Sequence, residues 1–396
     1  MKRAPASQSL LMHAAADTGW IVDRAKSLGF DLCGVVGAEK FPELEQFPEW
    51  LARGYAGEMN YLADPRRADP QQAMPGIRSV VVCLLNYNTA HSLSTDPRLP
   101  RDDGAPRGWI SRYAWGVDYH DVLREKLNAL AQSLSQRFTE RFEARAYADT
   151  GPLHERVLAK YAGLGWLGKN TLLLNHFLGS FFFLGVILST LDLQPTLGAN
   201  EMPPADLCGN CRQCLDACPT GAFVEPYLMD ARKCLSYLTI ELRGSIPQEF
   251  RVAMGHHVFG CDICQDVCPW NRQAAVATLP DFQPRVIPSQ KKTEDHAWSR
   301  SQDESLLLPR LEWLANLSEA EFRETFSRSP IKRTKWRGLV RNACIALGNS
   351  GVRRGTASHA RICALLQQLA ASREQLLAES ARWALSRIEQ EQVKQS

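Results

Sequence analysis

The sequence lacks three features that would have placed it in a simple class. Its formal net charge is only +3, so any contact with a nucleic acid must come from a local basic patch. Residues 1–20 contain no sustained apolar stretch, and we expect no secretory signal. The longest apolar run, Leu172–Leu191, is interrupted by polar residues such as Asn175. For this run we expect two buried strands with a turn near Gly179 rather than a membrane span.

Cysteine, by contrast, is abundant: the chain of 396 residues contains 12. A disulfide framework would need an oxidising compartment. Because no export signal is expected, the cysteine clusters are predicted to bind metal. The hydrophobic content of 45% and the charged content of 22% are ordinary for a globular protein, and the length predicts two or three domains.

Two cysteine runs carry the strongest pattern in the chain. The first has the spacing C-x2-C-x2-C-x3-C-P of bacterial ferredoxins and consists of Cys208, Cys211, Cys214, Cys218 and Pro219. The second is the same motif without its first cysteine and consists of Cys261, Cys264, Cys268 and Pro269. Val258 stands where the missing cysteine would be, and Cys234, between the runs, can replace it.

These eight thiols predict two [4Fe–4S] clusters with crossed ligation, because the cysteine before the proline points to the neighbouring cluster. Cluster one is expected to use Cys208, Cys211, Cys214 and Cys268. Cluster two is expected to use Cys218, Cys234, Cys261 and Cys264. Zinc sites also use C-x2-C pairs, but the tight three-cysteine run favours iron–sulfur. Small buried hydrophobic roles are predicted for the other cysteines, Cys33, Cys83, Cys344 and Cys363.

Apolar periodicity divides the chain into three predicted domains, 1–195, 196–283 and 284–396. The first is a mixed α/β region, with helices over 21–28, 119–138 and 153–161 and strands over 32–36 and 80–85. Proline-rich residues 195–204 form a linker to the cysteine-rich domain, and polar residues 284–304 form a second linker. The last domain is helical, with periodic segments at 339–347, 360–369 and 374–388.

A glycine motif in the first domain suggests nucleotide binding, but its context does not. Gly163, Gly165 and Gly168 spell G-x-G-x-x-G, and residues 163–170 nearly spell a P-loop. Both motifs require a preceding strand, whereas a helix is predicted here, and Asn170 replaces the hydroxyl that would bind magnesium. The glycines and Lys169 would still let the backbone approach a large polar ligand.

Five longer motifs together resemble the epoxyqueuosine reductase family, and the resemblance covers most of the chain. They are residues 110–120, 149–156, 163–171, 234–241 and 260–271. The resemblance implies a cytoplasmic enzyme that reduces epoxyqueuosine to queuosine at the wobble position of tRNAs with GUN anticodons. It also implies cobalamin in the N-terminal α/β domain, a ferredoxin-like domain with two [4Fe–4S] clusters, and C-terminal HEAT-like helical repeats.

The resemblance also implies site residues. Asp149 matches the proton donor of the family, and a carboxyl group beside a large apolar cofactor should have a raised pKa. Its position before Pro152 alone would favour a helix N-cap. The residues expected at cobalamin are Arg67, Tyr113, Asp149, Lys169, Asn170, Leu173, Leu174, Asn175 and Ser180. Leu173 and Leu174 also fit a core role, and Arg67 also fits a solvated charge.

A basic segment near the C-terminus is the expected tRNA contact. It consists of Arg328, Lys332, Arg333, Lys335, Trp336, Arg337 and Arg341, without an acidic residue. The cations can neutralise phosphates, and an exposed tryptophan can stack on a base. A solvated helix face with a core tryptophan is the alternative.

Electrons are expected from an external one-electron donor such as a flavodoxin or ferredoxin, and we expect a monomer that does not associate with membranes. Three other classes remain open on the sequence. A reductive dehalogenase-like enzyme would share the cobalamin and the two clusters, but such enzymes are typically exported with a twin-arginine leader. A ferredoxin-type electron carrier would not need the large first domain. A zinc-binding RNA protein is the third.

Overall fold

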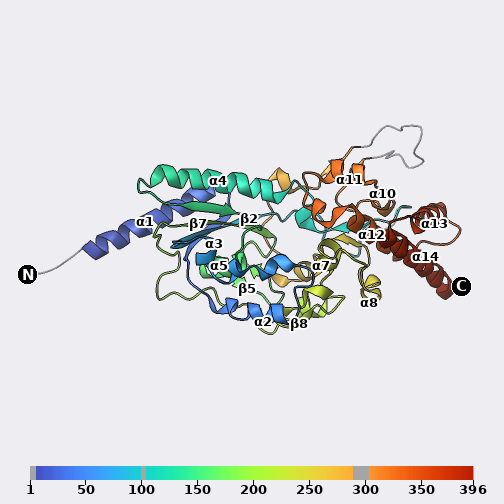
Figure 1. The fold of residues 1–396 in the computed structure, drawn as a ribbon, viewed down its shortest axis with the longest axis horizontal. Helices are drawn as coiled ribbons and strands as arrows, with labels where there is room; N and C mark the ends of the chain where they lie inside the picture. The colour runs from blue at the N-terminus through green and yellow to red at the C-terminus, as the bar shows by residue number, and fades with distance from the viewer. Residues whose placement is uncertain (1–5, 100–103, 289–302, 396) are drawn as a thin grey trace, which may run out of the picture.

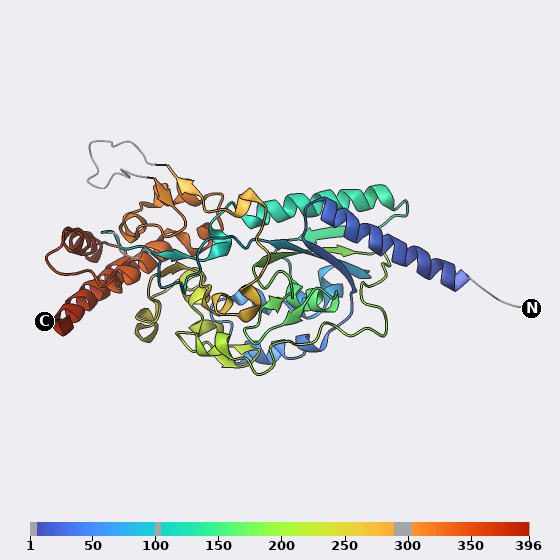
Figure 2. The ribbon, with the colours of Figure 1, turned by 180° about the vertical axis from the view of Figure 1, so that it is seen from behind.

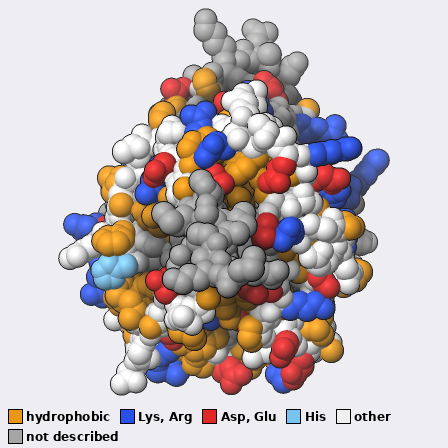
Figure 3. All heavy atoms as spheres, turned by 90° about the vertical axis from the view of Figure 1, so that its left-hand side faces the viewer, with side chains coloured by type: hydrophobic (Ala, Val, Ile, Leu, Met, Phe, Trp, Pro, Cys, Tyr) orange, Lys and Arg blue, Asp and Glu red, His pale blue; other side chains and the backbone are white. Residues whose placement is uncertain are grey.

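The computed structural model describes residues 6–99, 104–288 and 303–395. The molecule is elongated, and helix α1 (Ala6–Ser27) and helix α14 (Gln375–Gln395) lie at opposite ends (Figure 1). Acidic and basic side chains are interspersed on the end of the molecule that carries α1 (Figure 3), which agrees with the small net charge.

A four-stranded antiparallel sheet forms the centre of the N-terminal half. Its order is β1-β2-β7-β4, with bounds Leu32–Gly37, Ser79–Asn86, Phe182–Ser189 and Ala144–Tyr147. Successive side chains of β2 point to opposite faces, and all eight residues of this strand are buried. The sheet must therefore be covered on both sides, which explains why Val80–Leu85 is a continuous apolar run.

Helices cover both faces of this sheet (Figures 1 and 2). On one face, α1 and α4 (Tyr119–Arg137) pack against Val81, Cys83 and Leu85. On the other, α3 (Pro70–Ala73) and α5 (Glu155–Tyr161) pack against the alternate residues of β2. The peripheral helix α2 spans Phe47–Ala52. The mixed α/β architecture predicted for this half is thereby confirmed.

The run Leu172–Leu191 forms two buried strands, as predicted. Strand β6 (Leu173–Leu174) is followed by a turn in which Gly179 has a φ of 64°, and then by β7. Among the described residues, no helix is both long enough and apolar enough to cross a membrane.

The glycine motif is explained by close packing in the hairpin of β5 (Trp166–Leu167) and β6. A Cβ atom on Gly165 would lie 2.1 Å from the carbonyl oxygen of Leu174. Helix α5 precedes the motif, as predicted, so the strand that a dinucleotide or P-loop fingerprint requires is replaced by a helix.

The cysteine-rich region contains only short elements. Helices α6 (Gln213–Asp216) and α9 (Ile263–Asp266) each lie within one of the two cysteine runs. The other elements are β8 (Phe223–Glu225), β9 (Leu228–Met229), α7 (Leu235–Ile240), α8 (Gln248–Arg251) and β10 (His257–Phe259).

The C-terminal part is helical apart from the short pair β11 (Val286–Ile287) and β12 (Glu304–Ser305). Residues 289–302 of the predicted linker lie outside the described residues. The helices are α10 (Leu311–Ala315), α11 (Glu319–Phe326), α12 (Lys335–Gly348), α13 (Ala357–Ala370) and α14. The last three match the predicted periodic segments, and Asn349 caps the C-terminus of α12.

One core joins the segment before α4 to the C-terminal helices. Strand β3 (Trp109–Ile110) pairs in parallel with β10, and the Trp109 indole donates a hydrogen bond of 3.0 Å to Asp262. Trp109, Ile110 and Trp115 belong to the same buried cluster as the apolar faces of α10, α12 and α14. The segment before α4 is therefore an integral part of the packing of the C-terminal helices.

Candidate functional site

The four cysteines predicted to bind cluster one line a single cavity of about 230 Å³. Three come from the first run and Cys268 from the second, so the fold brings the two runs together. Lys169, Asn170 and Leu174 line the same cavity. Lys169 donates a hydrogen bond of 3.0 Å to the carbonyl of Cys211, which fixes the loop that carries the thiols.

The other four cysteines also lie near one another. Burial raises the pKa of the Cys264 thiol well above its ordinary value, and the neighbouring sulfurs of Cys234, Cys214 and Cys218 raise it further. Burial likewise raises the pKa of Cys261. Within the described ranges, no three His, Cys, Asp or Glu side chains are grouped to hold a single metal ion.

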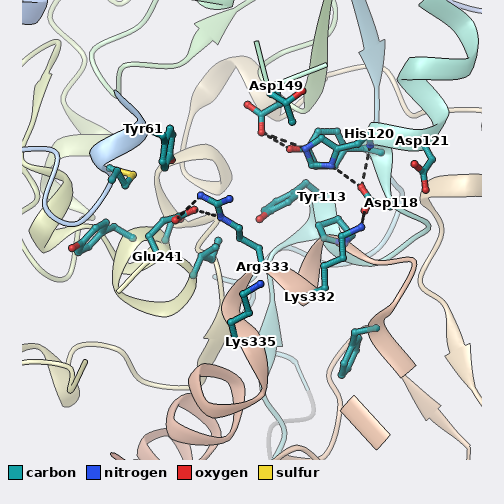
Figure 4. Close-up of a pocket in the computed structure, with 18 of the residues that line it drawn as sticks. Tyr61, Tyr113, Asp118, His120, Asp121, Asp149, Glu241, Lys332, Arg333 and Lys335 are labelled. Carbon is teal, nitrogen blue, oxygen red and sulfur yellow. Dashed lines mark hydrogen bonds and ion pairs between the residues drawn. The ribbon is translucent and has the colours of Figure 1, made fainter. Parts of the chain in front are cut away.

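A second cavity, of about 1270 Å³, lies where the three regions of the chain meet (Figure 4). Ligand pockets usually measure roughly 300–1,000 Å³, so this one has room for an unusually large ligand. Its wall includes Tyr61, Arg67, Tyr113, Asp149, Cys234, Tyr237, Glu241, Phe322, Lys332 and Trp336. Cys234 therefore belongs both to the predicted second cluster and to the wall of the large pocket.

Asp149 follows strand β4 and projects into this pocket with a φ of 61°, in the left-handed region that non-glycine residues seldom adopt. Its carboxylate accepts a hydrogen bond of 2.7 Å from the Tyr119 hydroxyl, and the Nε2 atom of His120 is 3.7 Å away. Its backbone N–H donates to Glu155. The N-cap of α5 is His154, so the alternative of Asp149 as a helix cap is wrong.

The raised pKa predicted for Asp149 presupposes an apolar cofactor beside it and stays a prediction; the contacts within the chain act in the opposite direction. Although the side chain is 64% exposed to the pocket, the surrounding protein partly desolvates the carboxylate, which alone would raise the pKa. The contacts from His120 and Tyr119 stabilise the carboxylate more strongly and lower the pKa. Burial, followed by the charge of Asp149, instead raises the pKa of the neighbouring Glu155.

The environment of His120 explains this effect. Asp118, the N-cap of α4, is buried, and its carboxylate contacts His120 Nδ1 at 2.7 Å and Lys332 Nζ at 2.7 Å. Burial lowers the pKa of His120, but the hydrogen bond to Asp118 and the nearby carboxylate of Asp149 outweigh burial and raise it to about 9. The sequence predicts Tyr119 and His120 only as residues of a helix. Their place in the motif 110–120 is the one feature of the sequence that could have indicated a role at the site.

The residues expected at cobalamin separate into groups. Arg67, Tyr113 and Asp149 line the large pocket, whereas Lys169, Asn170 and Leu174 line the cluster-one cavity. Leu173 is buried in the core. Asn175 donates to the Leu164 carbonyl, and the Ser180 hydroxyl accepts from Gln265 and Asn271. The fold thus brings only three of the nine side chains to the wall of the large pocket.

One residue of the basic segment is not a surface group. Arg341 is 0% exposed and donates to the carbonyls of Leu238, Leu242 and Gly244. Its assignment as a tRNA contact is therefore wrong, because a phosphate cannot reach it. The helical spacing of α12 places it on the buried face of the helix.

The remaining cations of the segment are exposed, but acids from distant parts of the chain neutralise three of them. Lys332 pairs with Asp118, Arg333 with Glu241 and Arg337 with Glu374. Arg328 and Lys335 are also exposed. Trp336 is half-buried, lines the large pocket and donates its indole N–H to the Leu317 carbonyl at 2.6 Å.

Two protein-family profiles match the chain. Residues 67–150 match the profile described as epoxyqueuosine reductase QueG, DUF1730. Residues 207–271 match a 4Fe-4S double cluster binding domain. The second match contains all eight cysteines of the two predicted clusters and shows the iron–sulfur character of this domain.

Curated relatives and solved structures agree with these profiles. The epoxyqueuosine reductase of Gloeobacter violaceus is 43% identical over 84% of this chain and 96% of its own length. The epoxyqueuosine reductase of Escherichia coli K12 is 38% identical over 82% of this chain and 78% of its own length. The crystal structure of an epoxyqueuosine reductase with an epoxyqueuosine-modified tRNA stem loop matches with a TM-score of 0.79 and 30% identity, over 95% of this chain and 91% of that one.

A structure of the Bacillus subtilis epoxyqueuosine reductase matches with a TM-score of 0.77 and 28% identity, over 95% of this chain and 91% of that one. In that structure an aspartate-bearing catalytic loop is swung out of the active site. The motifs, the paired cysteine runs, the fold and these similarities lead to one conclusion. The chain belongs to the epoxyqueuosine reductase family.

Proposed function

We propose that this protein reduces epoxyqueuosine to queuosine at the wobble position of tRNAs with GUN anticodons, in the cytoplasm. One observation carries the proposal: the large pocket has a predicted cluster ligand, Cys234, and an acid, Asp149, in the same wall. The names of the relatives and the stem loop bound to a similar enzyme support the choice of substrate.

The reaction fixes what the site must supply. Converting an epoxide to an alkene takes two electrons and two protons and releases one water. The two clusters can each carry one electron at a time, supplied by a donor of the flavodoxin or ferredoxin class. Cys234 lines the wall of the pocket, so the second cluster would lie there if Cys234 is one of its ligands.

Cobalamin is the cofactor that we assign to the large pocket. The volume suits a large ligand, and the wall combines apolar and aromatic surface with cationic groups, among them Arg67. Arg67, Tyr113 and Asp149 would hold it, since these expected contacts line the cavity. When bound, cobalamin supplies a cobalt centre that accepts single electrons and passes them to the substrate.

The residues of the chain then have separate tasks. Asp149 delivers a proton to the oxygen that leaves the carbon. The Tyr119 hydroxyl, 2.7 Å from its carboxylate, fixes the orientation of that carboxylate. Tyr113 and Phe322 give the pocket an apolar wall that excludes water from the reacting bond.

The tRNA is assigned to the surface around the pocket mouth. Within the basic segment, Arg328 and Lys335 are exposed, and no ion pair with an acid is seen for them among the described residues. Lys332, Arg333 and Arg337 would exchange their carboxylate partners for phosphates. We infer that helices α10–α14, which contribute to one apolar core, form the HEAT-like repeats that would present this surface.

The test is a direct assay. Protein purified anaerobically, with its iron and sulfide measured, is incubated with cobalamin, reductant and epoxyqueuosine-containing tRNA, and the nucleosides are analysed by mass spectrometry. We expect queuosine from the native protein and none from Asp149→Asn, which should retain both clusters. Absence of queuosine with the fully loaded native protein would refute the proposed function.

A further inference from the structure

A connected polar network lies behind Asp149 in the pocket wall (Figure 4). Asp118 is 2% exposed and holds the Nδ1 atom of His120 at 2.7 Å, so the opposite ring nitrogen points toward Asp149. His120 Nε2 and the Asp149 carboxylate are 3.7 Å apart. The imidazole ring is stacked on the Tyr119 ring, with ring centroids 4.0 Å apart, which restricts its rotation.

The stoichiometry of the proposed reaction gives this network a task. Two protons are needed for each turnover, whereas a single carboxyl group delivers one at a time. We propose that His120 is the proton store of the site: its Nε2–H reloads Asp149, and Asp149 passes each proton to the substrate oxygen. This inference rests on the proposed function. His120 acts through Asp149 and is therefore a positioning residue rather than a catalytic one.

The charges that face His120 favour its protonated form. Asp118 lies on one side of the ring and Asp149 on the other. Glu155 lies behind Asp149, but burial raises its pKa well above the ordinary value, so it adds little negative charge. Lys332 opposes them through its ion pair with Asp118. The acids prevail over Lys332 and over burial, and the pKa of His120 rises to about 9. At neutral pH the proton thus resides on His120 and the lowered pKa leaves Asp149 as a carboxylate.

The transfer balances in atoms and electrons. The His120 Nε2–H bond breaks as an O–H bond forms on Asp149; this transfer is uphill in pKa and is driven by the strongly basic oxygen that takes the proton next. That O–H bond then breaks as the oxygen leaving the epoxide carbon is protonated. After a second proton the oxygen departs as water, and the two electrons come from the one-electron donor of the proposed function. Neutral His120 regains protons from solvent, to which its side chain is 23% exposed.

The distance between the two groups requires a small movement. A separation of 3.7 Å exceeds a hydrogen bond, and such contacts often shorten only when the substrate is bound. Asp149 is able to move: its side chain is 64% exposed and its backbone is in a strained conformation. The Tyr119 hydroxyl bonds the same carboxylate oxygen, Oδ2, and so keeps it on the His120 side.

The test compares His120→Gln with His359→Gln, the same exchange on α13, a helix that contributes nothing to the pocket wall. Cluster spectra and cobalamin binding are recorded first for both. Queuosine formation is then measured in single turnovers from pH 6 to pH 10. In the native protein we expect the rate to fall above about pH 9. His120→Gln should be about 100-fold slower at neutral pH and should lack this limb.

A second variant separates proton storage from a purely structural role. Asp118→Asn keeps the helix cap but removes the charge beside Nδ1, so it should lower the pKa of His120. Histidine-selective NMR titration, assigned with His120→Gln, measures that pKa without turnover. In Asp118→Asn, the pH above which the rate falls should decrease together with the pKa of His120 measured by NMR.

The outcomes are distinct. Two results with an active native protein would overturn the inference. In one, the rate of His120→Gln still falls above about pH 9; in the other, the pH at which the rate of Asp118→Asn falls does not follow the pKa measured by NMR. A histidine signal that titrates near its ordinary value in the native protein would do the same. Native protein that forms no queuosine at any pH refutes the proposed function instead.

Discussion

The burial of Arg341 leads to a quantitative prediction about stability. Replacing it with methionine keeps an unbranched chain of similar bulk but removes the donors to the Leu238, Leu242 and Gly244 carbonyls. A buried acceptor left without a partner costs roughly 1–3 kcal/mol. Gly244 is exposed, so water can replace the guanidinium at its carbonyl. The total cost should therefore lie near the lower end of the range for three acceptors that lose their donor. We expect the free energy of unfolding to fall by about 3 kcal/mol.

The matched control is Arg337→Met, one turn earlier on the same helix. Its ion pair with Glu374 is exposed, and such pairs contribute roughly 0–1 kcal/mol. Anaerobic thermal scans at one heating rate should show a melting temperature about 5 °C lower for Arg341→Met and little change for the control. At a temperature where both variants are folded, Arg341→Met should bind tRNA like the native protein.

The opposite pattern would refute this reasoning. If Arg341→Met melted like Arg337→Met and bound tRNA more weakly, the guanidinium would be a phosphate contact and not a buried structural group. Burial lowers the pKa of Arg341 only to about 10, so the side chain is charged at neutral pH in either case.

Three further predictions concern the clusters, the glycine hairpin and the pH dependence of stability. Cys234→Ser should lose the second cluster and about half of the iron measured by chemical analysis; a full complement of iron would reject Cys234 as its ligand. Gly165→Ala should destabilise the protein by roughly 1–3 kcal/mol in denaturant titrations, since its Cβ would meet the Leu174 carbonyl, and an unchanged midpoint would contradict that packing. The raised pKa of His120 means that its stabilisation is complete below pH 6.5 and is lost as the pH rises through about 9. The stability advantage of the native protein over His120→Gln should therefore shrink by about 3 kcal/mol between pH 6 and pH 10, and a constant difference would disprove the linkage.

Local patterns in the sequence predicted much of the scaffold. The all-apolar run Val80–Leu85 became a strand buried on both faces, and the periodic segment 119–138 became α4. The cysteine spacing predicted which thiols share a cavity, because ligand geometry restricts the chain between them. In these cases the relevant physics lies within a few residues or in the metal chemistry itself.

The electrostatics of the site could not be predicted in this way. The basic segment contains no acid, yet Asp118, Glu241 and Glu374 reach it from other elements. Asp149 was expected beside an apolar cofactor, and only the folded chain reveals His120 at its other side. Pairing of this kind depends on how distant elements pack, which periodicity within one segment does not specify.

The core shared by Trp109, Trp115 and helices α10, α12 and α14 has a consequence for synthesis on the ribosome. The two tryptophans leave the exit tunnel long before the helices that bury them. At roughly 5–20 residues per second, their apolar surface stays uncovered for on the order of ten seconds or more. We therefore expect nascent chains that end before α12 to depend on chaperones, and translation arrested there to yield aggregation-prone intermediates.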